Sequence, residues 1–446
     1  MKKYKGYKVS GVEWIGEVPS HWDIAPLKRT LTLNNGCDYK HIISDDGYPV
    51  LGSGGQFAYA SDYLYDGEVL LLGRKGTIDR PLYFKGKFWT VDTMFYGVPK
   101  DNSDAKYLYY QAITFPFDYY ATATALPSMK GSDLENNPIC LPPLAEQKAI
   151  AEYLDEKCGK IDGMIEQIDK KIALYERLRR AIITKAVTKG LDPNVSLRQS
   201  GVEWIGEIPM HWEVKRFGYF AWIRARLGWK GLKADEYVES GYPFLSAFNI
   251  VNDKVNWESL NYINQFRYEE SPEIMLHPGD ILLVKDGAGI GKCARVDFLP
   301  KGESTTNGSL AVITPFETVN YKYLHYFIIS DSFNQYKDIL INGMGVPHLT
   351  QGEMKKMYLP VPPIKEQEEI AEYLDKRCQV IEENIVKYVK QKELLERYRK
   401  ALIAQVVTGK RRVCEPSFIY PDATPISPAM AAEENLKCAQ PLHTHV

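Results

Sequence analysis

Residues 141–158 read LPPLAEQKAIAEYLDEKC, and residues 361–378 read VPPIKEQEEIAEYLDKRC. The likeness continues along one offset of 220 residues to about residue 409. Beyond each Pro-Pro pair, apolar residues recur at alternating spacings of three and four, which is the heptad pattern of a coiled-coil helix. Because proline is tolerated before a helix and in its first turn but not inside it, the helices should begin near residues 143 and 363.

The heptad positions of the two copies are almost entirely apolar. In the first copy ten of eleven positions are apolar, and in the second copy nine of eleven are. The first run is Ala151, Leu154, Cys158, Ile161, Ile165, Ile168, Ile172, Tyr175, Arg179, Ile182 and Ala186, and the second is Ala371, Leu374, Cys378, Ile381, Ile385, Tyr388, Lys392, Leu395, Arg399, Leu402 and Val406. At about 1.5 Å per residue, a helix of about 45 residues spans on the order of 65–70 Å, comparable to two turns of DNA.

Each apolar stripe needs a partner, and we expect the two helices to pair with each other as an antiparallel coiled coil. The alternative is that each helix only caps its own domain, but a narrow seam of this length exceeds what one small domain covers. Arg179 and Arg399 interrupt the two seams at equivalent positions. We expect them to carry solvated charges on buried stems, and the alternative is that they fix the register or provide a docking point.

A second repeat precedes each helix at a different offset. Residues 11–22 read GVEWIGEVPSHW and residues 201–212 read GVEWIGEIPMHW, which are ten identities in twelve at an offset of 190. Since the two offsets differ by 30 residues, the segments between the repeats differ in length and form two variable domains. We divide the chain into a first globular domain (1–140), a first long helix (141–190), a second globular domain (191–360), a second long helix (361–412) and a tail (413–446).

The tail is rich in proline, alanine and polar residues and lacks periodicity, so it is predicted to be disordered. The variable domains contain short apolar runs between Gly, Asp and Asn turns, as in 68–72 and 281–284, together with amphipathic stretches at 106–113 and 321–329. This mixture predicts an α+β fold. Matching segments, such as GEVLLLGRKGTI at 67–78 and GDILLVKDGAGI at 279–290, indicate that both domains share it.

Composition narrows the class of protein. The chain has 446 residues, of which 45% are hydrophobic and 25% charged, as is typical of soluble globular proteins. Its apolar runs fall short of a membrane span, and its basic N-terminal residues have no apolar stretch behind them, so we expect a cytoplasmic protein without a signal peptide. The seven cysteines are scattered and never spaced as Cys-x-x-Cys, which indicates neither a disulfide framework nor a zinc site.

The overall charge does not indicate a nucleic-acid partner, because the chain has 55 Lys and Arg and 57 Asp and Glu. A DNA-binding role therefore has to rest on local basic clusters in the variable domains. Such side chains suit phosphate contact and base reading, although a cluster of this kind, taken alone, is more often a solvated turn. The candidates are Arg74, Lys75, Arg80 and Lys130 in the first domain, and Arg224, Arg226, Lys230, Lys233, Asn249, Lys285, Lys292 and His348 in the second.

The sequence contains no recognisable catalytic motif. GAGIGKC at 287–293 has one residue too few between its glycines for a phosphate-binding loop and lacks the Ser or Thr after its lysine. LPPL and VPPI lack the polar residue and the aromatic of the element that holds a target amine in amino-methyltransferases. The histidines have no metal-ligand spacing. We therefore expect neither catalysis nor a cofactor or metal in this chain.

Two variable domains, each introduced by GVEWIGE and followed by a long helix that opens with L/V-P-P-L/I-x-E-Q-x-x-I-A-E-Y-L-D, resemble the specificity subunit of a type I restriction-modification enzyme. The resemblance covers the chain to about residue 412. It implies two target-recognition domains that each read one half of a split double-stranded DNA site, with the paired helices as a ruler between them. It further implies two methyltransferase subunits that methylate adenine N6, and restriction subunits that translocate and cleave DNA.

Because the two variable domains differ, the two half-sites should differ, and the whole site should be asymmetric. A nearly neutral chain that leaves most phosphate neutralisation to its partners should bind DNA weakly by itself. The first alternative is a non-catalytic scaffold whose coiled coil assembles unrelated partners. A nuclease or methyltransferase ranks third, because its motifs are missing.

Overall fold

The computed structural model describes residues 3–120, 127–226, 232, 236–287, 289–341 and 348–413. The chain divides into two compact units, one formed by residues Met1–Ile168 and Lys390–Val446 and the other by Asp169–Val389. We call them unit 1 and unit 2. All but the first residue of the tail predicted at 413–446 lies outside the described residues.

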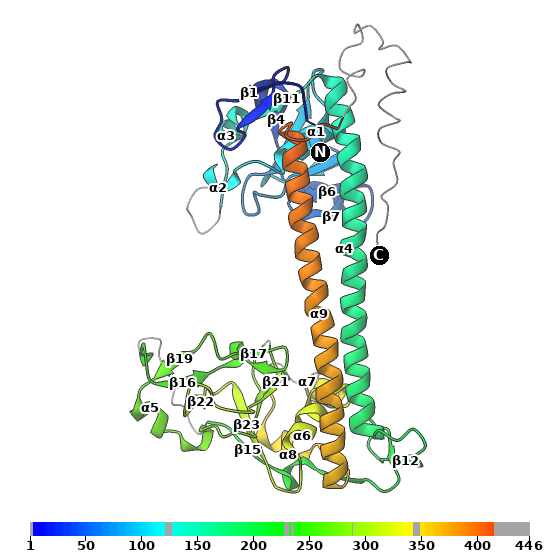
Figure 1. Ribbon diagram of the computed structural model, residues 1–446, viewed down its shortest axis with the longest axis vertical. Coiled ribbons are helices and arrows are strands. Elements are labelled where there is room, and N and C mark those ends of the chain that lie inside the picture. The colour runs from blue at the N-terminus through cyan, green and yellow to red at the C-terminus, as the bar shows by residue number, and fades with distance from the viewer. Residues whose placement is uncertain are drawn as a thin grey trace, which may run out of the picture. The chain divides into compact units, whose positions relative to one another are not determined.

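The two predicted long helices are present as α4 (Leu144–Lys189) and α9 (Ile364–Val407) (Figure 1). They begin one residue after the expected positions, and the amide of Gln147 donates to Pro143 O at 3.0 Å. Each helix ends at a glycine with positive φ, Gly190 at 72° and Gly409 at 73°. Glycine adopts this left-handed conformation without steric cost, so each glycine terminates its helix.

The long helices pack on each other antiparallel, as expected. In unit 1, Leu154 and Ile161 of α4 share a core with Leu402 and Val406 of α9. In unit 2 the opposite ends meet, and α4 residues 183–187 share a core with α9 residues 370–378. Both cores also contain residues of the globular part of the unit, so the helices complete the two domains as well as pairing with each other.

The two arginines that interrupt the seams make equivalent ion pairs between the helices. Arg399 Nε lies 2.8 Å from Asp162 Oδ1 in unit 1, and Arg179 Nη2 lies 3.9 Å from Glu382 Oε1 in unit 2. Arg179 also binds Asp253 Oδ2 at 2.8 Å. These contacts favour the interpretation that the two arginines fix the register of the pair.

Unit 1 is built on one seven-stranded sheet in the order β4-β10-β8-β9-β6-β7-β5. Its neighbouring strands are antiparallel except for β6 and β9, which are parallel. The strands are β4 (Leu31–Asn35), β5 (Ile43–Ser44), β6 (Tyr48–Gly52), β7 (Gly55–Ala60), β8 (Tyr65–Gly73), β9 (Leu82–Thr90) and β10 (Met94–Pro99). The helices are α1 (Ala105–Ala112), α2 (Phe117–Tyr120) and α3 (Gly131–Asn136), and short pairs join β1 (Tyr7–Val9) to β2 (Glu17–Pro19) and β3 (Asp23–Pro26) to β11 (Pro138–Leu141).

Unit 2 repeats this plan with two smaller sheets, β15-β23-β20-β21 and β19-β16-β22, in which β16 and β22 are parallel. The strands are β15 (Ala221–Arg224), β16 (Tyr242–Leu245), β19 (Asn261–Ile263), β20 (Ile281–Val284), β21 (Cys293–Arg295), β22 (Thr305–Thr306) and β23 (Leu310–Pro315). The short pairs are β12 (Leu197–Gln199) with β13 (Glu207–Pro209), β14 (Glu213–Arg216) with β24 (Tyr358–Val361), and β17 (Ile250–Val251) with β18 (Lys254–Val255). The helices are α5 (Gln265–Glu269), α6 (Tyr321–Ile328), α7 (Asp331–Ile341) and α8 (Gln351–Lys356).

The strand register relates the two units residue by residue. Gly73 of β8 lies opposite Met94, and Val284 of β20 lies opposite Leu310. The equivalent of Gly73 is therefore Val284, one residue before the position that the sequence match of 67–78 with 279–290 suggests. Burial agrees, because Leu72 and Leu283 both point into the core that contains the long helices.

The two sequence repeats meet in one joint in each unit. In unit 1, Glu146 of α4 binds His21 Nε2 at 2.9 Å and accepts from Trp22 Nε1 at 3.1 Å. In unit 2, Glu366 contacts the equivalent histidine and tryptophan, residues 211 and 212, at the same distances. The repeats thus recur because each pair forms a contact between the start of the domain and the start of its helix.

Within the part of the chain that the structure describes, no helix has both the length and the apolar character needed to cross a membrane.

Candidate nucleic-acid interface

The predicted basic residues of unit 1 gather at one edge of its sheet. Strand β8 is antiparallel to β10 and β9, and β4 is antiparallel to β10, so the ends of β4 and β8 lie beside the starts of β9 and β10. Arg74 and Lys75 directly follow β8, and Arg80 lies two residues before β9. We call this edge of each sheet, with the segments that leave it, the recognition edge.

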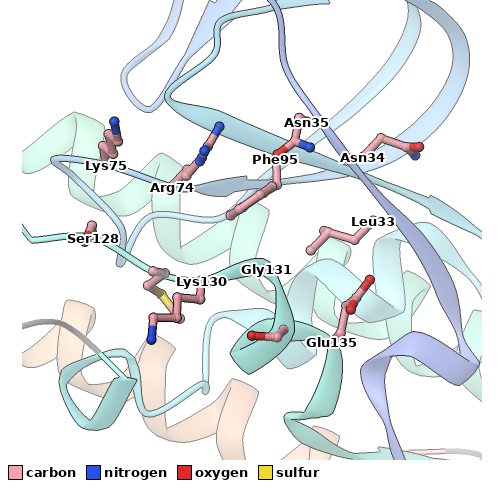
Figure 2. A pocket seen from close by; sticks show the side chains of 12 residues that line it. Leu33, Asn34, Asn35, Arg74, Lys75, Phe95, Ser128, Lys130, Gly131 and Glu135 are labelled. Atoms are coloured by element: carbon pink, nitrogen blue, oxygen red, sulfur yellow. The ribbon is translucent and has the colours of Figure 1, made fainter.

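A cavity of about 440 Å³ opens at the recognition edge of unit 1 (Figure 2). Three of the predicted residues line it, Arg74, Lys75 and Lys130, whereas Arg80 is exposed and does not. The full lining is Leu33, Asn34, Asn35, Arg74, Lys75, Phe95, Ser128, Met129, Lys130, Gly131, Ser132 and Glu135. In Figure 2 the ends of Arg74 and Lys75 extend to one side of the cavity, and the ammonium of Lys130 extends to the other.

Backbone hydrogen bonds hold Arg74 in place and bring Lys130 to it. The Arg74 amide donates to Thr93 O at 2.8 Å, and the Met129 amide donates to Arg74 O at 3.0 Å. The guanidinium lies 5.7 Å from the centroid of the Phe95 ring, close enough for a cation–π contact. The arginine is thereby held half-buried at the wall of the cavity, which suits a group that must meet a ligand in one orientation.

The sequence analysis missed two residues of this cavity, Asn34 and Asn35 at the end of β4. An asparagine amide can form two hydrogen bonds with an adenine edge, so both belong among the candidates for base contact. The segment Asn34-Asn35-Gly36 has the composition of a turn and gave no separate signal. Gly36 is needed for the approach of β4 to the next turn, because a Cβ there would lie 2.0 Å from Val91 O.

In unit 2 the counterpart of Arg74 is Lys285. The Lys285 amide donates to Ser309 O at 2.9 Å, and the Leu349 amide donates to Lys285 O at 2.9 Å, which repeats the two backbone contacts of Arg74. The Lys285 ammonium is paired with Asp286, whose other carboxylate oxygen contacts His348 Nδ1. The structure therefore brings together two of the predicted residues, Lys285 and His348, through one aspartate.

Lys292 lies at the same edge, because it directly precedes β21, the antiparallel neighbour of β20. Its side chain is exposed. Arg80 precedes β9 in the corresponding part of unit 1, so each recognition edge carries an exposed cation before this strand.

Arg224 is buried, at 4% exposure. Its Nη2 lies 2.7 Å from Asp280 Oδ2, and its Nη1 donates to Met275 O at 2.6 Å. Removing either partner of a buried pair leaves an uncompensated charge, so the pair stabilises the sheet only as a unit. Arg224 therefore has a structural role and is not among the proposed DNA contacts.

Asn249 and Arg226 are also turned inward. Asn249 is 6% exposed, accepts from the Ser246 amide at 2.9 Å and donates to Ser259 O at 2.7 Å. The side chain of Arg226 is largely buried and pairs with Glu270 at 3.6 Å. Their predicted roles in DNA contact lose support because these groups already have partners inside the unit. Lys230 and Lys233 lie outside the described residues.

A buried histidine lies away from the recognition edge, on α6. His325 lines a cavity of about 220 Å³ together with Arg179 and Arg295. Burial and the nearby charges of Arg295 and Arg179 lower the pKa of His325 to about 3. The imidazole is therefore neutral at neutral pH, and its position in the interior makes it part of the packing of unit 2. Among the described residues, no group of three His, Cys, Asp or Glu side chains is arranged to hold a metal ion.

The chain thus contains two related domains, each completed by the paired helices, whose equivalent sheet edges carry different polar side chains. Residues 19–173 and 209–391 match the family model of the type I restriction modification DNA specificity domain. These matches cover more than half of the chain, which therefore belongs to this family.

Known relatives agree with this assignment. The chain is 28% identical over 298 residues to the type I restriction enzyme MjaVIII specificity subunit of Methanocaldococcus jannaschii, covering 66% of this chain and 67% of the relative. It is 26% identical to the putative type I restriction enzyme MjaX specificity subunit of the same organism, covering 90% and 96%. A chain from a solved structure of a type I R-M system has the same fold, with a TM-score of 0.58 and 15% identity over 87% of this chain and 98% of that one.

Proposed function

We propose that this chain is the DNA sequence-specificity subunit of a type I restriction-modification complex. The observation that carries the proposal is the pair of recognition edges, which occupy equivalent places on one fold but carry different polar side chains. In unit 1 the edge offers Arg74 beside Lys75 and two asparagines. In unit 2 it offers Lys285 with Asp286 and His348.

Each edge is proposed to read one half of a bipartite double-stranded DNA site. Arginine and lysine pair with the O6 and N7 atoms of guanine in the major groove, and asparagine pairs with adenine. Since different donors and acceptors occupy the two edges, the two half-sites differ and the complete site is asymmetric. The paired helices α4 and α9 set the length of the unread spacer between the halves.

The chemistry is proposed to lie in partner subunits. Two methyltransferase subunits transfer a methyl group to adenine N6, and restriction subunits translocate and cleave DNA that is unmodified. This chain contributes recognition without catalysis. The globular segments 23–140 and 213–360 carry net charges of −3 and −1, so the chain alone is expected to bind DNA weakly. Tight, sequence-selective binding by the isolated chain in moderate salt would contradict this division of work.

Mapping of N6-methyladenine across the genome tests the proposal. Cells carrying the chain with its methyltransferase partner should show an asymmetric two-part motif that disappears without the chain. Arg74→Ala should relax the motif in one half only, and Lys285→Ala should relax the other half, because each good base contact is worth about 1–3 kcal/mol of discrimination.

Matched controls are available on the opposite side of each sheet. Arg29 is exposed before the start of β4, and Lys301 is exposed before the start of β22, so both lie away from the recognition edge. Arg29→Ala and Lys301→Ala should leave the motif unchanged. If partner assembly is intact and all four variants methylate alike, the scaffold interpretation replaces the proposal.

A further inference from the structure

A phenylalanine at the recognition edge of unit 2 is almost fully exposed to solvent. Phe248 is 93% exposed and lies in the short 3₁₀ helix η5 (Ala247–Asn249), directly after the end of β16. Single exposed apolar side chains are common on protein surfaces, but this ring is almost wholly in water, where an apolar group is unfavourable, and it lies beside the proposed DNA contacts. The proposed function assigns no role to this ring.

Hydrogen bonds of neighbouring polar side chains fix the backbone around Phe248. Ser246 and Asn249 form a reciprocal capping box around η5. The buried Asn249 amide also donates to Ser259 O at 2.7 Å, and the Asn256 amide donates to Asn249 O at 2.7 Å. Asn249, predicted from the sequence to touch DNA, instead holds its neighbour in position. A ring that is both exposed and rigidly presented loses little conformational freedom when it meets a ligand.

Two backbone hydrogen bonds connect this segment to the proposed DNA contacts. The Asn307 amide donates to Leu245 O at 2.8 Å, at the end of β16. In the same turn, Ser309 O accepts from the amide of Lys285 at 2.9 Å. The end of β16, which Phe248 follows, therefore lies beside the turn that holds Lys285. DNA bound at this edge would contact both Phe248 and Lys285.

We propose that the Phe248 ring inserts between neighbouring base pairs of the second half-site; this inference rests on the proposed function. Phenylalanine is one of the apolar wedges that DNA-bending proteins insert, most often from the minor groove, to unstack a base step. Contact with a thymine methyl group in the groove needs only one face or edge of a ring. With 93% exposure, protein atoms cover neither face of Phe248, so both are available to stack against bases.

Unit 1 carries an exposed phenylalanine in the corresponding region, after the end of β6. Phe57 of β7 is only 55% exposed, because Tyr39 packs against it with ring centroids 5.3 Å apart and planes at 88°. A ring supported on one side suits contact with a groove wall or a sugar. Insertion is therefore assigned to unit 2 alone. Apart from the target adenines, which methyltransferases flip out of the stack, the DNA should be unstacked in the second half-site only.

The test uses the complete complex of the chain with its methyltransferase partners and duplexes that contain the mapped site. 2-Aminopurine is placed at successive positions of each half-site, since its fluorescence rises when it loses stacking. At positions away from the target adenines, which the methyltransferase partners flip out, the wild-type complex should raise the fluorescence several-fold at one step of the second half-site. Phe248→Ala should abolish this rise and weaken binding about 10- to 100-fold, the effect of losing one stacked aromatic contact. Phe248→Leu, which keeps an apolar wedge, should retain part of the rise.

Phe266→Ala is the matched control, because Phe266 is 71% exposed on α5, beyond the opposite end of β16. It should leave fluorescence and binding unchanged. Insertion is overturned if the wild-type complex binds tightly without a rise at any position other than the target adenines, or if the Phe248→Ala complex shows the same rise as the wild type. In either case the methylation motif still supports the proposed function. If the wild-type complex neither binds nor methylates a bipartite site, both proposals fall together.

Discussion

Glu146 shows how one side chain ties a domain to its helix. Its carboxylate is buried and accepts from Tyr4 at 2.6 Å and from Trp22 at 3.1 Å, besides its contact with His21. The polar groups of these three aromatic residues all converge on it from the N-terminal segment. Contacts of this kind explain why both repeats contain the same residues, because the repeated side chains hold each domain to its helix.

Glu146→Ala should destabilise unit 1 by about 3 kcal/mol, because it strands buried hydrogen-bond donors. Urea unfolding, followed by tryptophan fluorescence, measures the loss. Glu152→Ala, an exposed glutamate of the same helix, should change the midpoint little. Equal effects of the two substitutions would show that the buried contacts of Glu146 do not add to the free energy of unfolding.

His325 makes the stability of unit 2 dependent on pH. Burial holds the pKa of His325 at about 3, below the value near 6.5 of an unfolded chain, with Arg295 and Arg179 lowering it and Asp375 raising it. Between these values only the unfolded state takes up the proton, so stability should fall as the pH drops from about 6.5 toward 3. KYLYY at 106–110 matches KYLHY at 322–326, so Tyr109 of unit 1 is the counterpart of His325. His325→Tyr should therefore remove this part of the pH dependence in denaturation curves measured across the range. An unchanged slope would contradict the assignment.

At the scale of elements, the glycines of the long helices have two different roles. Gly409 and Gly190 end the helices, whereas Gly159 lies inside α4. The positive φ of Gly409 and a Cβ position 2.2 Å from Pro19 leave no room for a side chain. Gly190 has nearly the same φ but a looser surrounding, because the nearest atoms to its Cβ position are Glu366 Oε1 at 3.2 Å and a ring carbon of Trp212 at 3.3 Å. Gly159, inside α4, has no neighbour within 4 Å of its Cβ position.

Gly409→Ala should therefore destabilise the protein by about 2 kcal/mol or more, and Gly190→Ala by about 1–2 kcal/mol. Gly159→Ala should stabilise it by up to about 1 kcal/mol, since alanine favours the helix interior. Thermal unfolding of the three variants should rank them in this order. Destabilisation by Gly159→Ala would mean that softness of α4 at this point is required.

At the scale of the whole molecule, the paired helices are proposed to act as a ruler. Insertion of one heptad into both α4 and α9 keeps the apolar seam continuous and adds about 10 Å at about 1.5 Å per residue. With about 3.4 Å per base pair, the methylated motif should gain about three base pairs of spacer while both halves stay the same. An unchanged spacer would reject the ruler, and a single-residue insertion, which breaks the seam, should abolish methylation.

Local patterns in the sequence determined the helices, their start after the Pro-Pro pairs, several sheet strands and the family, because heptad spacing and repeated motifs are readable along the chain. The tertiary structure alone decided which polar residues face outward. Arg224 and Asn249 look like surface residues in the sequence, yet both are buried, and Arg224 has a hydrogen-bond partner 90 positions away. Conversely, Asn35 and Lys130 line one cavity although 95 positions separate them. Burial and convergence depend on contacts between distant segments, and no local spacing encodes them.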